Sequence, residues 1–196
     1  MATHKTVFDS DFKLEKDDHL YDYQDDLTTK LDKLNNPFDQ QIINEIVLWK
    51  VNRFASPTVQ TLDLLNQIDS KSTDLDINLT TEILKALLKT KGIQLPMAST
   101  ILRFKNKNVY QIIDQRVYRI IYKDKKLKLN TYLNDKNLTD QIELYLKYLT
   151  DLKSICSSIN IQFDKADRIL FMADRRINKN IPLDNYSSNV AKRNGE

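Results

Sequence analysis

The residues best equipped for chemistry lie in a basic segment in the middle of the chain, residues 91–128. It has ten lysines and arginines and two aspartates, a net charge of +8, whereas the whole chain of 196 residues carries +3. Clustered basic side chains neutralise phosphates and release counterions, so the segment predicts a nucleic-acid partner. From charge alone, a solvated face is an equal alternative. The basic residues, with aromatic residues interleaved, are Lys91, Arg103, Lys105, Lys107, Arg116, Arg119, Lys123, Lys125, Lys126 and Lys128.

The first part of this segment predicts a tight turn between two helices. A helical pattern over about residues 78–90 stops at Lys91 and Gly92, and Pro96 stands where a second helix can begin. Backbone amides in such a turn, beside a helix N-terminus, present donors and a positive dipole to a phosphate. Gly92 is equally compatible with an ordinary helix C-cap.

Asp114 follows an apolar run and precedes a helical pattern that contains Arg116 and Arg119. An aspartate in that position is a preferred N-cap, which is its simplest interpretation. The two arginines have few acidic neighbours in the sequence, which favours phosphate contact over surface ion pairs. The acids and bases near the C-terminus are expected to pair locally and are assigned no chemistry: Asp167, Arg168, Asp174, Arg175 and Arg176.

The elements that must position these residues are helices. The chain has only 2 glycines and 4 prolines, which argues against sheet-rich folds and glycine-rich phosphate loops. Apolar residues recur at helical spacing, and the segment before Asp114 is the one strand-like stretch. The prediction is an all-α fold of about eight helices. Its expected helices cover residues 37–55, 57–68, 78–90, from 96 onward, from 114 onward, 139–158 and 164–178.

The expected organisation is one helical domain with two terminal extensions. Residues 1–36 hold most of an acidic N-terminal excess and are expected to form a solvated arm or helix. Residues 37–180 form the domain, which contains the helical hairpin at 84–105 and the aspartate segment at 109–122. Residues 181–196 are expected to fray.

Several function classes are excluded by composition. The single Cys156 argues against an internal disulfide, a cysteine-built zinc site and an iron–sulfur cluster, and no metal site is predicted. His4 and His19 lie in the charged N-terminal stretch, which disfavours a nucleophile–histidine arrangement. No apolar run approaches the ~20 residues that span a bilayer, and the N-terminus lacks a signal peptide's apolar core. The expectation is a cytoplasmic protein without a membrane partner.

Residues 84–121, LKALLKTKGIQLPMASTILRFKNKNVYQIIDQRVYRII, resemble the helix-hairpin-helix DNA glycosylase superfamily. The family signature is a leucine-rich helix, a glycine-containing hairpin, a second helix that opens near Thr-Ala, and an aspartate downstream. Here Leu88 precedes the hairpin, Met97-Ala98-Ser99 opens the second helix, and Asp114 stands at the fitting distance. The resemblance covers about a fifth of the chain closely.

This resemblance implies a double-stranded DNA partner and a monofunctional DNA glycosylase. Asp114 would be the catalytic carboxylate: it would stabilise the oxocarbenium-like state formed as the bond between a flipped base and its sugar breaks. No cofactor is implied beyond a monovalent cation at the hairpin. Trp49 is a core residue or, as the lesser alternative, lines the base pocket. The implied DNA-binding residues are Lys91, Gly92, Ile93, Gln94, Ser99, Arg103, Arg116 and Arg119.

Two positions depart from the family pattern. Gln94 stands where the hairpin usually has a second glycine, which alters the phosphate grip. Pro96 stands where bifunctional members carry the lysine nucleophile, and proline cannot form a Schiff base. Two other functions therefore remain open: a non-catalytic DNA-binding or sensing module of the same fold, and a helical protein-interaction domain whose basic block binds an acidic partner.

Overall fold

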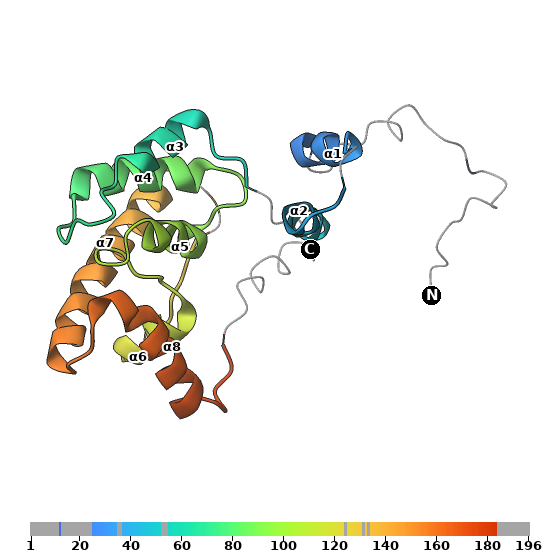
Figure 1. The fold of residues 1–196 in the computed structure, drawn as a ribbon. Helices are drawn as coiled ribbons and strands as arrows, with labels where there is room; N and C mark the ends of the chain where they lie inside the picture. The colour runs from blue at the N-terminus through green and yellow to red at the C-terminus, as the bar shows by residue number, and fades with distance from the viewer. Residues whose placement is uncertain are drawn as a thin grey trace, which may run out of the picture. The chain divides into compact units, whose positions relative to one another are not determined.

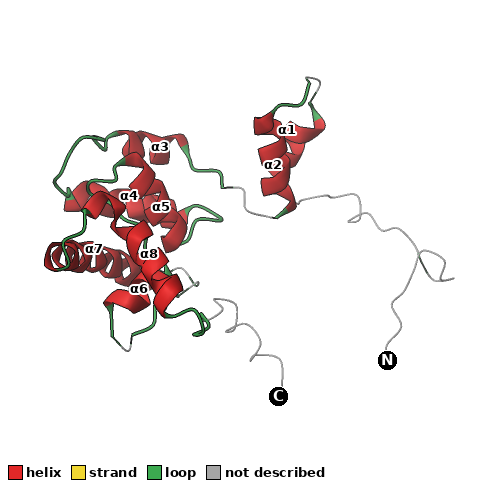
Figure 2. Ribbon diagram, turned by 60° about the horizontal axis from the view of Figure 1, so that its bottom comes forward, coloured by secondary structure: helices red, strands yellow, loops and turns green. Residues whose placement is uncertain are grey.

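The computed structural model describes Phe12 and residues 25–34, 37–51, 55–123, 125–130, 132 and 134–183. The chain divides into two compact units, residues 1–54 and residues 55–196, and each is described by itself (Figure 1). Every element in the described ranges is a helix, joined to the next by loops and turns (Figure 2). The predicted all-α fold is confirmed.

Among its described residues, the first unit contains two helices, α1 (Asp25–Asp32) and α2 (Gln40–Lys50). The Trp49 indole N–H donates to the Thr28 hydroxyl at 2.8 Å, and Lys30 pairs with Glu45 at 2.6 Å. Leu27 is 1 % exposed, whereas α2 buries no side chain fully. These contacts place α1 and α2 together in the compact unit that ends at residue 54. The domain expected from the sequence begins at residue 37 instead and so includes α2.

The second unit contains six α-helices within the part of the chain that the structure describes. Each corresponds to a helix expected from the sequence, with ends shifted by a few residues. They are α3 (Val59–Asn66), α4 (Ile77–Lys89), α5 (Leu95–Lys105), α6 (Gln115–Ile121), α7 (Asp135–Ser158) and α8 (Ala166–Ile177), the last preceded by a 3₁₀ turn (Phe163–Lys165).

Local sequence signals account for where most of these helices begin. A side-chain oxygen of the N-cap residue accepts a hydrogen bond from an amide three residues later, which satisfies one of the orphan donors of the first turn. Asn134 does so for α7, with 2.8 Å to the amide of Asn137, and α7 therefore starts before residue 139. The α5 helix instead has a proline in its first turn. The capping residues are Asp39, Thr58, Asp76, Asp114 and Asn134.

The core of the second unit forms where α4 and α7 pack against each other. Leu84 and Leu87 of α4, and Tyr145 and Leu152 of α7, are fully buried. Helices α3 and α4 pack together, and α6 and α8 pack together at the opposite end of the unit (Figures 1 and 2). The hairpin helix α5 and the segment that leads to Asp114 lie between these two pairs.

Candidate nucleic-acid interface

The turn between α4 and α5 is a tight hairpin of five residues. Thr90 caps α4 with its N–H on the Leu87 carbonyl at 2.9 Å, and the Ile93 N–H donates to Thr90 at 3.1 Å. Gly92 has φ 86°, a left-handed conformation that a β-carbon would disfavour. The Ile93 side chain is only 4 % exposed, which anchors the turn to the core. The helix–turn–helix arrangement expected from the sequence is therefore present.

The surface of the hairpin is basic, and two of its lysines were not singled out from the sequence. Lys85 and Lys89 lie one turn apart on α4, and together with Lys91 they are exposed. Within the described residues, none of the three has an ion-pair partner. Their i, i+4 spacing near a glycine turn is the signal that would have identified them. Gly92 and Gln94 are also exposed beside them.

The segment before Asp114 is extended, and buried side chains hold its backbone. The hydroxyl of Tyr145 donates to the Gln111 carbonyl at 3.0 Å, and that of Tyr148 donates to the Ile112 carbonyl at 2.7 Å. Burial raises the pKa of both tyrosines well above the usual value, so both remain protonated donors. These hydrogen bonds replace the backbone partners that a neighbouring strand would supply in a β-sheet.

Ser99 joins this segment to the hairpin helix. Its hydroxyl oxygen accepts a hydrogen bond from the Ile113 N–H at 3.2 Å and donates one to the Pro96 carbonyl at 2.8 Å. Ser99 is 0 % exposed, so it does not present its hydroxyl to DNA as the resemblance implied. The same contact brings the first turns of α5 next to Asp114, which the sequence alone could only suggest.

Asp114 is the N-cap of α6. A carboxylate oxygen accepts a hydrogen bond from the Val117 N–H at 2.8 Å, and the side chain is half-buried. Burial raises the pKa of Asp114, although the amides of Val117 and Arg116 and the charge of Arg116 act in the opposite direction. The capping interpretation is therefore confirmed. The hydrogen bond from Val117 uses the Oδ1 atom of the carboxylate.

Arg103 is inside the protein. It is 6 % exposed, its guanidinium donates to the Asp164 carbonyl at 3.2 Å, and its Nε lies 3.4 Å from Asp167 Oδ2. Asp167 is itself only 3 % exposed. The expected phosphate contact of Arg103 does not fit this structure, because the guanidinium is already enclosed and paired.

Arg116 and Arg119 converge on one buried carboxylate. Asp174 of α8 is 0 % exposed and lies 3.2 Å from Arg116 and 2.6 Å from the Nε of Arg119. A second hydrogen bond from Arg119 Nη2 at 2.8 Å makes that pair bidentate. The sequence favoured phosphate contact for these arginines because few acids lie near them along the chain. Their acid is supplied by a helix more than fifty residues away.

The acids of α8 were expected to pair locally, which was wrong. Asp167, Leu170 and Asp174 occupy positions i, i+3 and i+7 of α8, so the two acids lie on the same face as the buried Leu170. That spacing was the available signal, since an acid on the apolar face of a helix needs a cation from elsewhere in the fold.

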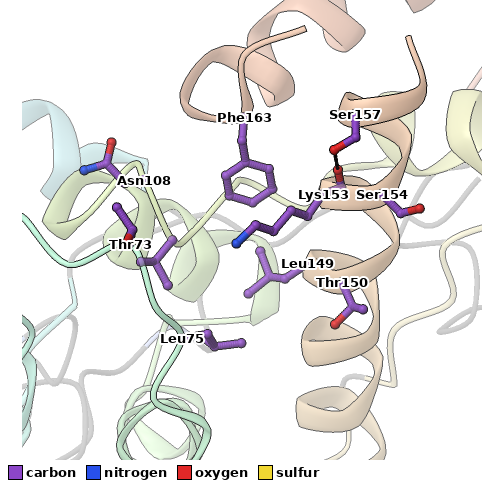
Figure 3. Close-up of a pocket in the computed structure, with 10 residues that line it drawn as sticks. Thr73, Leu75, Asn108, Leu149, Thr150, Lys153, Ser154, Ser157 and Phe163 are labelled. Atoms are coloured by element: carbon purple, nitrogen blue, oxygen red, sulfur yellow. Dashed lines mark hydrogen bonds between the residues drawn. The ribbon is translucent and has the colours of Figure 1, made fainter. Parts of the chain in front are cut away.

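Trp49, the candidate for the base pocket, belongs to the first unit, where its indole bonds to Thr28. Its role in a pocket stays a prediction. A cavity of about 290 Å³ lies in the second unit between α7 and the loops before α4 and α6 (Figure 3). Lys153 extends from α7 toward Thr73 across it. None of the predicted site residues lines it; its lining is Thr73, Leu75, Asn108, Val109, Leu149, Thr150, Lys153, Ser154, Ser157 and Phe163.

Comparison with protein-family models, with curated proteins and with solved structures finds no match. In the described ranges, no three histidine, cysteine or acidic residues gather where they could hold a metal ion. None of the described helices combines the length and the apolar character needed to cross a membrane.

Removal of a single hydroxyl tests how the Asp114 segment is held. Tyr148→Phe removes the donor of the part-buried hydrogen bond to the Ile112 carbonyl, and we expect a loss of about 1–2 kcal/mol in the free energy of unfolding. Urea unfolding measures it. Tyr132→Phe, at a tyrosine that is 71 % exposed, is the control and should change stability by less than about 0.5 kcal/mol. Equal effects of the two changes would contradict the assigned hydrogen bond.

Proposed function

We propose that this protein binds duplex DNA through the α4–α5 hairpin and hydrolyses the N-glycosidic bond of a flipped base with Asp114. One observation carries the proposal. The hydroxyl of Ser99 in α5 accepts a hydrogen bond from the N–H of Ile113, the residue before Asp114, so the hairpin helix lies next to the aspartate. The sequence places them fifteen positions apart. A phosphate held at the hairpin would thus lie close to the carboxylate.

The hairpin supplies the grip on the DNA backbone. Gly92 turns the chain in a left-handed conformation into α5, where the first-turn amides lack partners within the helix and the helix dipole favours an anion. Lys85, Lys89 and Lys91 add three exposed positive charges without carboxylate partners among the described residues. Amides fix the position of a phosphate, and the lysines supply most of the salt-dependent affinity.

Asp114 supplies the negative charge that the reaction needs. As the base–sugar bond breaks, positive charge develops on the sugar, and a nearby carboxylate stabilises it and orients the attacking water. The base has to leave the duplex to reach that carboxylate. Because Pro96 occupies the position of the lysine nucleophile, the reaction would release the base without cutting the DNA backbone.

A non-catalytic DNA-binding module is the second candidate, and one observation favours it. Asp114 already caps α6 through its hydrogen bond to the Val117 N–H, so the need for a cap alone accounts for an aspartate at this position. This candidate keeps the hairpin and its lysines and assigns Asp114 to structure alone.

The salt dependence of duplex binding tests the shared part of both candidates. Substitution of Lys85, Lys89 and Lys91 by alanine should weaken binding and flatten the slope of log affinity against log salt. The expected reduction is about 0.9 for each lysine that contacts a phosphate. Arg103 and Arg116 are unsuited to this test because their ion pairs are internal.

The matched control substitutes three other exposed lysines, Lys71, Lys136 and Lys147, by alanine and removes the same net charge. Its slope should remain within about 0.5 of the parent's, since these lysines lie away from the hairpin. Duplex binding that is weak at low salt, or equal slopes for the two triple variants, would reject the hairpin as the interface. Binding to acidic proteins without binding to DNA would favour a protein-interaction domain.

A further inference from the structure

The outer face of α8 carries an uncompensated basic surface. Arg168, Arg175 and Arg176 are exposed on the helix, and Lys165 and Lys179 are exposed at its two ends. Arg168 and Arg175 are seven positions apart, two turns of an α-helix, so they lie on one side. Among the described residues, none of these five cations has a carboxylate partner.

The acids that would neutralise this face point inward. Both acidic residues of α8 are buried, with Asp167 beside Arg103 and Asp174 between Arg116 and Arg119. The helix that packs against α8, α6, contains no acidic residue. Asp164, just before α8, lies 3.2 Å from Lys107. The two carboxylates of α8 therefore form ion pairs with arginines of the basic central segment. The arginines of α8 itself are left without a carboxylate partner among the described residues.

We infer that this outer face of α8 binds the phosphate backbone of nucleic acid. The inference rests on the proposed function and adds a second surface to the hairpin. Arg168 and Arg176 are separated by about 12 Å along the helix axis, at 1.5 Å per residue. That length matches several successive phosphates, because duplex DNA carries a negative charge for about every 1.7 Å of its axis.

A nucleic acid fits this face better than a membrane does. Helices that lie on membranes bury a continuous apolar face in the lipid. The apolar side of α8 instead packs into the protein through Ala166 and Leu170. On the outer face, Ile169 and Met172 are exposed one helical turn apart, and Ile177 is exposed at the end of the helix. The repeated positive charges around these few apolar side chains are suited to a line of phosphates.

The test substitutes Arg168, Arg175 and Arg176 by glutamine in the full chain and measures binding of a duplex oligonucleotide by fluorescence anisotropy. We expect at least about ten-fold weaker binding near 0.1 M salt and a slope reduced by about 0.9 for each arginine that contacts a phosphate. The melting temperature should be unchanged, because these side chains are exposed. The control is again the triple alanine variant of Lys71, Lys136 and Lys147.

The outcomes separate the two proposals. If the hairpin variant loses binding and the α8 variant matches the control, the hairpin proposal stands and the inference about α8 is wrong. If the α8 variant loses slope and the hairpin variant does not, α8 is the interface and the hairpin proposal is wrong. Binding to vesicles with anionic headgroups, but not to DNA, would overturn the inference about α8.

Discussion

Asp114→Asn is expected to keep the protein folded and bound to DNA and to slow base release at least about 100-fold. Asparagine caps a helix about as well as aspartate, so the hydrogen bond to the Val117 N–H and the start of α6 are retained. The lost negative charge acts on the transition state far more than on the bound substrate. DNA affinity should stay the same or rise, since a charge that repels phosphate has gone.

The assay must first find a substrate. Duplexes with different damaged or modified bases are incubated with the parent protein, and abasic sites are read by alkali cleavage in single-turnover reactions. Undiminished release by Asp114→Asn would remove Asp114 from the chemistry. A parent that releases no base from any duplex but still binds DNA would favour the non-catalytic module.

Asp114→Ala separates the cap from the charge. Alanine removes the acceptor for the first turn of α6, and we expect a further loss of about 1 kcal/mol of stability that the asparagine variant does not show. Thermal unfolding of the parent and of both variants gives this difference.

Asp174→Ala is expected to reduce the free energy of unfolding by about 3 kcal/mol. The substitution leaves the guanidinium groups of Arg116 and Arg119 side by side without their shared anion. Loss of one member of a buried ion pair costs about 3–5 kcal/mol, and the low end applies because both arginines keep some solvent contact. The control, Asp140→Ala, breaks an exposed i, i+4 pair with Lys136 and should cost less than about 1 kcal/mol.

The pKa of Asp174 predicts how the difference in unfolding free energy between the parent and Asp174→Ala depends on pH. Burial alone would raise this pKa, but the hydrogen bonds from Arg119, Asn178 and Arg116 outweigh it, and the pKa is lowered. A lowered pKa in the folded state adds stability that is fully present above the unfolded value of about 3.9 and is lost as pH falls through the folded value. The difference in unfolding free energy between the parent and Asp174→Ala should therefore be constant at pH 5–8 and become smaller in acid. A constant difference down to pH 2 would contradict the ion pairs.

The sequence by itself determined the helices and the hairpin, because these depend on neighbours along the chain. Apolar spacing marks the core face of α4, and Gly92 and Pro96 mark the turn. Asp114 caps its own helix through an amide three residues away. Such signals act over one or two turns, so they can be read from a single sequence.

The pairing of charges was decided only by the tertiary structure. Net charge per segment indicated that Arg103, Arg116 and Arg119 face DNA, but the fold brings α8 against α6 and presents Asp167 and Asp174 to them. An enclosed cation needs an anion within a few ångströms, and that anion can come from any part of the chain. Which basic residues are left for a partner therefore depends on packing, and here it leaves the hairpin lysines and the arginines of α8 exposed.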